Sequence, residues 1–447
     1  MSVFNHLRLG SGVFKLDVER LQKGWYSDKY FVNITNTLVA LRRERYSFSL
    51  HTSRLGTDQN NLEYNPGDLE VEMQWFTRHP GNTVIVGVDK ALAILRECTG
   101  YWEDGKFFNT WDRLEVWAVE DGSTAAYHGN PETVQPVLRV RGRYADFANL
   151  ETPTLGILTR ASRVATNVYD TLVAARGKPV LFFPARFDLH EVQAADGYAY
   201  QIAVQRFNED YGKGLGSFVS TDAQGDWWGG AGGGTVAHAL IACFVGDTAE
   251  AMLAFSSTVD PAILRIALVD FNNDSVRDSL ATCEAMFRRY MAEKDAGNPE
   301  RARRFILNGV RLDTSAGMRD ASLEALGDPL LDQGVNPRLV HNVRAALDDA
   351  WQNWNLPPEW IEEARNYCRN VKIVVSGGFN IAKITRFENQ SVPVDIYAVG
   401  SAFFDNYEAT KMDFTADVVR VKVNGQWVEM AKTGRRACDN PNLLRIK

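Results

Sequence analysis

The feature that most constrains the fold is a repeated pattern from about residue 155 onward, in which short apolar runs alternate with amphipathic helical stretches. The apolar runs are residues 178–185, 264–271, 305–313, 371–380 and 394–403. A strand followed by a helix, several times over, predicts parallel strands. Both a barrel and a doubly wound sheet fit this pattern, and we favour an irregular α/β barrel of parallel strands.

The two ends of the chain have a different pattern. Residues 113–144 alternate apolar and polar side chains between turn signals, which indicates strands. The tail has an Asn424-Gly425 pair between apolar runs, which is a signal for a β-hairpin. We therefore expect a smaller β-rich (α+β) domain from residues 1–153, joined by 406–447, and a barrel domain from residues 154–405.

Composition argues against several classes of partner. The chain carries 49 Lys and Arg against 56 Asp and Glu, a formal net charge of −7, so its surface as a whole does not attract nucleic acid or anionic lipid. No window approaches the roughly 20 apolar residues of a membrane span, and the N-terminus has no apolar stretch of signal-peptide length. Five cysteines without a CxxC pair fit a reducing compartment. We expect a cytoplasmic protein without nucleic-acid or membrane partners.

Polar and glycine residues follow the apolar runs. In α/β barrels, the loops after the strands carry the residues that contact ligands. These loops meet at one edge of the fold, so the residues that end the runs are candidates for a shared site. They are Arg186, Asp270, Asp313, Gly377, Gly378, Gly400 and Ser401.

The two glycine sites, Gly377-Gly378 and Gly400-Ser401, are candidates for binding phosphate. Glycine lets backbone N–H groups approach an anionic oxygen closely. A pair of ordinary turns is the alternative interpretation.

Acidic residues near strand ends are candidates for binding hydroxyls or Mg²⁺. Arg311 and Asp313 are two apart, so their side chains point to the same side of a strand. Arg311 suits a carboxylate or phosphate because its planar guanidinium binds oxyanions bidentately, whereas Asp313 suits ribose hydroxyls or a metal. A mutual salt bridge is the alternative. Asp270 offers oxygens to a hydroxyl or Mg²⁺ in the same way.

Aromatic and basic side chains indicate contacts with a flat ring and a polyanion. Phe183 and Arg186 could hold a heteroaromatic ring between a phenyl ring and a guanidinium plane. Alternatively, Phe183 is a core residue and Arg186 belongs to a surface ion pair. Arg160 could supply positive charge to a polyanion, although an arginine on a helix is more often solvated.

The segment GGAGGGTVAHAL, residues 229–240, has five glycines among its first six residues. It does not follow a strand-like run, and no GKS or GKT follows it, so neither a dinucleotide fingerprint nor a P-loop is indicated. Thr235 would lie near a helix N-terminus, where free N–H groups attract an anion. A flexible loop with a packed surface histidine, His238, is the alternative.

Six short segments occur in order between about residue 26 and residue 403. They are SDKYF (27–31), EDGSTAAYHGNP (120–131), LETPTLGILTRASRVAT (150–166), GTVAH (234–238), LVDFNND (268–274) and GVRLDTS (309–315). Together they resemble the nicotinate phosphoribosyltransferases of the type II phosphoribosyltransferase fold. GTVAH resembles the family's GT-x-AH motif, whose histidine is phosphorylated by ATP, and GVRLDTS resembles its GVR-[IL]-D segment.

The resemblance implies a reaction in NAD salvage: the phosphoribosyl group of phosphoribosyl pyrophosphate is transferred to nicotinate, giving nicotinate mononucleotide and pyrophosphate. It implies ATP as a co-substrate, with hydrolysis coupled through a phosphohistidine at His238. It also implies Mg²⁺, whose ligands it does not give, and a homodimer with active sites shared between subunits.

The resemblance further implies roles for individual residues. Tyr30 corresponds to a tyrosine that stacks on the pyridine ring from the neighbouring subunit, and Phe183 and Arg186 correspond to the family's Phe-x-x-Arg on the ring and near the phosphates. The implied catalytic residues are His238, Arg311 and Asp313. The implied substrate-binding residues are Tyr30, Phe183, Arg186, Arg160, Thr235, Asp270, Gly377, Gly378, Gly400 and Ser401.

Two alternatives remain open. A nicotinamide phosphoribosyltransferase would share the fold and the same aromatic and arginine positions, and it differs in whether the group facing the ring must bind a carboxylate or an amide. A catalytically silent homologue that senses nucleotides would be indicated by loss of His238, Arg311 or Asp313, and all three are present.

Overall fold

The computed structural model describes residues 7–49, 53–55, 63–408 and 410–447, and the chain forms two compact units. The N-terminal unit comprises Met1–Tyr169, Tyr198–Gly212 and Asp405–Lys447, and the second unit comprises Asp170–Gly197 and Lys213–Phe404. The chain passes between them within two helices, α4 (Glu151–Ala174) and α5 (Gln193–Tyr211).

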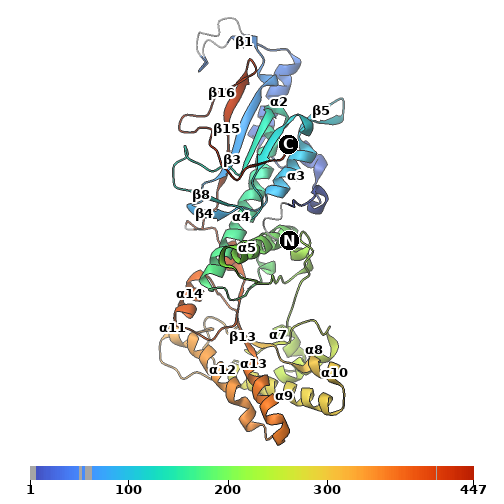
Figure 1. Cartoon of the computed structure of the whole chain (residues 1–447), viewed down its shortest axis with the longest axis vertical. Helices are drawn as coiled ribbons and strands as arrows, with labels where there is room; N and C mark the ends of the chain where they lie inside the picture. The colour runs from blue at the N-terminus through green and yellow to red at the C-terminus, as the bar shows by residue number, and fades with distance from the viewer. Residues whose placement is uncertain (1–6, 50–52, 56–62, 409) are drawn as a thin grey trace. The chain divides into compact units, whose positions relative to one another are not determined.

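An antiparallel sheet forms the centre of the N-terminal unit, with the strand order β16-β15-β3-β9-β7-β17 (Figure 1). This order places strands from the end of the chain beside strands from its first part, because β15 pairs with β3. The prediction of an α+β domain built from both ends of the chain is therefore confirmed, although this unit is not the smaller of the two. The strands are β3 (Glu70–Thr77), β7 (Glu115–Ala118), β9 (Leu138–Arg143), β15 (Phe414–Val423), β16 (Gln426–Glu429) and β17 (Leu444–Arg445).

Helices and short strand pairs complete this unit. Helix α3 buries Leu92 and Leu95 in the same hydrophobic cluster as the central strand β3, so the helix covers the apolar face of the sheet. The further elements are α1 (Val18–Gln22), α2 (Lys29–Arg43), α3 (Val88–Cys98), the pair β1 (Phe48–Ser49) and β2 (Glu63–Tyr64), the pair β4 (Gly81–Val84) and β8 (Thr124–Tyr127), and the pair β5 (Gly100–Glu103) and β6 (Lys106–Asn109).

The predicted hairpin at Asn424-Gly425 is confirmed. Strands β15 and β16 pair up to Val423 opposite Gln426, which leaves Asn424 and Gly425 as the turn. Both turn residues have positive φ, 53° and 75°. Two-residue turns of this kind match the twist of the strands, and asparagine followed by glycine adopts them at little cost.

Strand β3 is buried on both of its faces. Met73 and Trp75 point into the hydrophobic core. Gln74, on the opposite face, is buried because the C-terminal segment covers it: its amide donates to the Arg436 carbonyl at 3.0 Å and accepts from the Cys438 N–H at 3.0 Å. Hydrogen bonds to the strand therefore fix the path of the tail.

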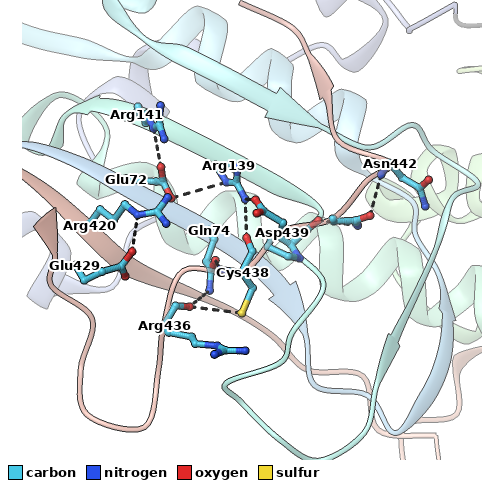
Figure 2. A network of polar contacts seen from close by, with 12 residues as sticks. Glu72, Gln74, Arg139, Arg141, Arg420, Glu429, Arg436, Cys438, Asp439 and Asn442 are labelled. Carbon is cyan, nitrogen blue, oxygen red and sulfur yellow. Dashed lines mark hydrogen bonds and ion pairs between the residues drawn. The ribbon is translucent and has the colours of Figure 1, made fainter. Parts of the chain in front are cut away.

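Glu72, on the same face as Gln74, is fully buried among arginines (Figure 2). Its carboxylate accepts hydrogen bonds from Arg141 at 2.6 Å and from Arg420 at 3.0 Å, and Arg139 lies 3.9 Å away. The Arg141 guanidinium also lies over two tryptophan rings. One carboxylate on β3 thus neutralises cations from both neighbouring strands, β9 and β15.

Glu151, at the start of α4, is a half-buried acid whose charge is unfavourable in the folded state. Burial, with smaller contributions from the Asp417 and Asp28 carboxylates, raises the pKa of the Glu151 carboxyl to about 8. Because this exceeds the ordinary value of 4.5, the folded state binds more protons than the unfolded state between these pH values. Stability contributed by this group is therefore present at low pH and is lost as the pH rises toward 8.

We expect Glu151→Gln to raise Tm by a few degrees at pH 9 and to change it little at pH 4, because the amide stays neutral at both. Calorimetry at the two pH values measures the difference. Glu44→Gln is the matched control, since Glu44 is exposed at the end of α2. Equal Tm values for Glu151→Gln and the wild type at pH 9 would contradict this prediction.

The second unit contains a parallel sheet with the order β10-β14-β13-β12-β11. Its strands are short and mostly buried, which is typical of a parallel sheet covered on both faces. Each apolar run of the sequence contains one strand, so the predicted α/β architecture is confirmed. The strands are β10 (Val180–Phe182), β11 (Ile266–Leu268), β12 (Gly309–Leu312), β13 (Lys372–Val375) and β14 (Ile396–Val399).

Beyond β10, the sheet continues as two isolated parallel bridges, from Phe182 to Val219 and from Val219 to Gly232. The segment after Gly232 then reaches the opposite edge, where His238 contacts Asp270, two residues after β11. The arrangement is that of an irregular barrel in which side chains, rather than strand pairing, span the last gap.

Helices follow the strands of this sheet (Figure 1). Side-chain caps start several of them: for example, Asp274 accepts from the Arg277 N–H at 3.0 Å, and Asn380 accepts from the Lys383 N–H at 2.9 Å. In the described part of the chain, no helix combines the length and the apolar character needed to cross a bilayer. The helices are α6 (Asp222–Gly225), α7 (His238–Cys243), α8 (Thr248–Thr258), α9 (Ser275–Asp295), α10 (Pro299–Ala302), α11 (Pro329–Asp332), α12 (Pro337–Asp349), α13 (Ile361–Asn370) and α14 (Ile381–Asn389).

Candidate functional site

A cavity of about 410 Å³ lies at the carboxyl ends of the parallel strands. Residues at or just after the ends of β10, β12, β13 and β14 line it, and this edge is where α/β folds bind ligands. The structure brings together nine of the residues expected from the sequence: Phe183, Arg186, His238, Arg311, Asp313, Gly377, Gly378, Gly400 and Ser401. The other lining residues are Phe187, Ala237, Ser376, Phe379 and Ala398.

Arg311 is a half-buried cation in the cavity wall. It lies on β12, between β11 and β13. Its guanidinium lies 5.8 Å from the centroid of the Phe183 ring and donates to the Val236 carbonyl at 3.3 Å. Burial lowers the pKa of Arg311, and the Asp313 and Asp270 carboxylates oppose that shift. A guanidinium remains charged at neutral pH, so the wall carries a permanent positive charge beside an aromatic ring.

Asp313 is oriented by a neighbouring strand. Its Oδ1 accepts a hydrogen bond from the Ser376 hydroxyl at 2.8 Å. Among the ion pairs of the described residues, none joins Asp313 to Arg311, so the salt-bridge interpretation is wrong. The two side chains instead present a carboxylate and a guanidinium to the same cavity.

His238 and Asp270 form a pair beside the cavity. The Nε2 atom of His238 lies 3.0 Å from Oδ1 of Asp270, and the histidine side chain is 45% exposed while the carboxylate is 9% exposed. Burial raises the pKa of Asp270, and the hydrogen bond with His238 acts in the opposite direction. When Nε2 donates to the carboxylate, Nδ1 keeps the lone pair. The pair therefore leaves a half-exposed imidazole with one nucleophilic nitrogen.

Glycine is required at two of the loops for different reasons. Gly377 and Gly378 have positive φ, 86° and 67°, which side chains rarely adopt. Gly400 is required by a close approach, because a Cβ there would lie 2.6 Å from the Phe187 ring. Both loops thus bring backbone close to the cavity, as phosphate binding would need.

The arginine beside the Phe183 ring is not the one expected from the sequence. Arg186 is exposed, and its guanidinium lies 5.0 Å from the centroid of the Phe187 ring. Arg311 takes the place beside Phe183. The two residues of the expected pair, Phe183 and Arg186, nevertheless line the same cavity.

The glycines before His238 allow close packing. The Gly232 N–H donates to the Asp222 carboxylate at 2.9 Å, and a Cβ on Gly230 would lie 2.2 Å from the Trp228 ring. These contacts hold the segment in a compact turn, which differs from the flexible-loop interpretation.

Four expected residues lie outside the lining of this cavity. Asp270 is connected to it through His238. Thr235 is half-buried, three residues before α7. Tyr30 on α2, which is 58% exposed, and Arg160 on α4, which is partly buried, belong to the N-terminal unit.

The acidic side chains of the site are compatible with Mg²⁺. No group of three or more His, Cys, Asp or Glu among the described residues is arranged to hold a metal ion. Mg²⁺ at phosphate sites, however, is typically bound by one or two carboxylates together with substrate phosphates and water. Asp313 lines the cavity and Asp270 lies next to it through His238, so these are the carboxylates that could take part in such a site.

Lys383, on α14, is a residue of this site that the sequence analysis missed. Its Nζ donates to the Gly377 carbonyl at 3.2 Å and lies 4.2 Å from the centroid of the Phe379 ring. Burial lowers the pKa of Lys383 to about 8. The available signal is its position in the first turn of the helix capped by Asn380, because helical side chains incline toward the N-terminus and so reach the preceding loop.

Comparison with known proteins identifies the fold. Residues 50–162 match the family described as quinolinate phosphoribosyl transferase, N-terminal domain. The nicotinate-nucleotide pyrophosphorylase from Pyrococcus furiosus is structurally similar, with a TM-score of 0.60 and 24% identity over 94% of this chain and 80% of that chain. The chain has a phosphoribosyltransferase fold. Human nicotinic acid phosphoribosyltransferase is also similar, with a TM-score of 0.51 and 16% identity over 81% of this chain and 72% of that one. No curated protein matches the sequence.

Proposed function

We propose that this protein is a phosphoribosyltransferase of NAD biosynthesis, which transfers the phosphoribosyl group of phosphoribosyl pyrophosphate to nicotinate. The observation that supports it is one cavity containing a half-buried arginine beside an aromatic ring, two glycine loops and a histidine next to a carboxylate. The guanidinium suits the carboxylate of nicotinate, the phenyl ring suits its pyridine ring, and the glycine loops suit the 5′-phosphate.

The chemistry requires orientation and charge more than proton transfer. The nicotinate ring nitrogen forms a bond to C1 of the ribose while the bond from C1 to pyrophosphate breaks, and its electron pair leaves with pyrophosphate. The ring nitrogen is already nucleophilic, so no general base is needed. Phe183 and Arg311 would orient the ring, and Asp313 would bind the ribose hydroxyls, which holds the nitrogen in line with C1. Mg²⁺, held by Asp270, Asp313 and phosphate oxygens, would neutralise the developing charge of the leaving group.

The proposal includes coupling to ATP through His238. In this step Nδ1 attacks the γ-phosphorus of ATP, a phosphoramidate forms and ADP leaves. Asp270 would stabilise the positive charge that develops on the imidazole, as carboxylates paired with histidine do in other sites. Later hydrolysis of the phosphohistidine returns phosphate and makes the cycle favour the mononucleotide.

We also propose a homodimer whose sites are completed by a neighbouring subunit. Tyr30 belongs to the N-terminal unit and exposes 58% of its surface, although it is a large aromatic residue. Its phenolic group donates to Asp28 and its ring contacts the Phe31 ring, so the exposed part of the ring would be the part that stacks on a pyridine ring.

Quinolinate is the second candidate substrate, because the matched family is described as quinolinate phosphoribosyl transferase, N-terminal domain. Quinolinate carries one carboxylate more than nicotinate and would need an additional positive group. Two arginines, Arg186 and Arg311, line the described cavity, and phosphates must be bound there as well. The small number of positive groups in the cavity therefore favours nicotinate, which has one carboxylate, over quinolinate, which has two.

The test is to incubate the purified protein with phosphoribosyl pyrophosphate, Mg²⁺ and nicotinate, nicotinamide or quinolinate, with and without ATP. Chromatography quantifies mononucleotide and ADP. Nicotinate mononucleotide formed together with ADP supports the whole proposal. If only nicotinamide or only quinolinate gives a product, that compound is the substrate instead of nicotinate. If none of the three gives a product, the protein is a catalytically silent homologue.

We expect His238→Ala to retain slow transfer to nicotinate and to lose its stimulation by ATP, because the phosphate acceptor is removed while the substrate loops remain. ADP release per mononucleotide is the measurement. His341→Ala is the control, since His341 is an exposed histidine of α12 in the same unit. Unchanged ADP release by His238→Ala would rule out the phosphohistidine.

A further inference from the structure

Lys383 places a cation against two residues that line the cavity. The residue is half-buried, and its ammonium group donates to the Gly377 carbonyl at 3.2 Å and lies over the Phe379 ring. Gly377, Gly378 and Phe379 all line the cavity. The charge therefore lies directly behind one of the two loops that the proposed function assigns to phosphate.

The positive groups of the lining are distributed unevenly. Arg186 lies over Phe187, whose ring contacts the Gly400 loop, and Arg311 lies beside Phe183. Among the described residues, no hydrogen bond joins either arginine to the Gly377-Gly378 turn, while the Asp313 carboxylate is close to it, 3.3 Å from a Cβ built on Gly377. A phosphate monoester between the two glycine loops would meet a negative charge on this side unless a further cation reached it.

We infer that Lys383 binds the phosphate monoester of the substrate at the Gly377-Gly378 turn, by exchanging its hydrogen bond to the Gly377 carbonyl for one to a phosphate oxygen. The inference rests on the proposed function, which places the 5′-phosphate at the glycine loops. Two features favour this exchange. A charge-assisted hydrogen bond to phosphate is stronger than one to a neutral carbonyl, and the four-carbon stem of lysine is flexible enough to move between them.

The experiment compares two ligands that represent the two ends of phosphoribosyl pyrophosphate. Ribose 5-phosphate and pyrophosphate are each titrated into the full-length protein by calorimetry, with nicotinate as a third ligand. We expect Lys383→Met to weaken the binding of ribose 5-phosphate by at least about tenfold. The affinities for pyrophosphate and nicotinate should change by less than about twofold. The variant Lys383→Arg should restore part of the lost affinity for ribose 5-phosphate. The control is Lys372→Met, because Lys372 starts β13 at its opposite end and pairs with Asp395.

The other outcomes overturn the inference in distinguishable ways. If the wild type binds ribose 5-phosphate and Lys383→Met binds it equally well, Lys383 does not bind the phosphate. The proposed function is not affected by that result. Equal weakening of all three ligands assigns Lys383 to the structure of the loop. If the wild type binds neither ribose 5-phosphate nor pyrophosphate, the proposed function fails and the inference fails with it.

Discussion

Replacing Arg311 with methionine is expected to lower kcat/KM for transfer to nicotinate by about a thousandfold, on the order of 4 kcal/mol. Two losses contribute. The carboxylate of nicotinate would lose its guanidinium partner beside Phe183, and the Asp270 and Asp313 carboxylates would lose the positive charge that acts on them in the cavity wall. Removing one member of a half-buried charge cluster leaves the other charges uncompensated, which costs more than the cluster contributes as a whole. Steady-state kinetics with both substrates varied measures the effect.

The conservative variant Arg311→Lys separates charge from geometry. It keeps a positive charge but cannot form two parallel hydrogen bonds to a carboxylate, so we expect it to recover only part of the loss. Thermal unfolding of both variants shows whether the fold is preserved. A loss of less than about tenfold for Arg311→Met in a folded protein would contradict a role for Arg311 in recognising nicotinate.

Much of the second unit could be predicted because parallel strands that are buried on both faces occur in the sequence as short runs of apolar residues. Each of the apolar runs contains a strand, and the residues after the strands meet at one cavity. Spacing along a strand also placed Arg311 and Asp313 correctly on the same side. Spacing could not show which partner each would take, because Phe183 and Ser376 come from other strands.

Other parts of the site depend on contacts that no local pattern records. Lys383 resembles a solvated helical lysine in the sequence, and only the path of the preceding loop brings it to Gly377. The glycines before His238 suggested flexibility, whereas the Trp228 ring shows that they allow close packing. In both cases the decisive neighbour is set by tertiary structure rather than by residue type.

The face of β3 that carries Glu72 is a further example, and it leads to the second prediction. Alternation along the strand would make Glu72 a solvated residue, yet it is fully buried among arginine side chains from the neighbouring strands. We expect Glu72→Gln to lower the free energy of unfolding by about 2–3 kcal/mol, because Arg139, Arg141 and Arg420 would then repel one another without a carboxylate between them. These arginines are partly exposed, which keeps the value below that of a fully buried cluster.

Glu429→Gln is the matched control for this change. Glu429 accepts a hydrogen bond from the same arginine, Arg420, at 2.7 Å, but its side chain is 60% exposed, so its loss should cost less than about 1 kcal/mol. Guanidinium unfolding followed by tryptophan fluorescence compares the two variants with the wild type, since Trp117 and Trp427 flank Arg141. Equal losses for both variants would mean that the sheet does not depend on the Glu72 charge. A larger loss for Glu72→Gln would show that one buried carboxylate holds β9 and β15 to the central strand.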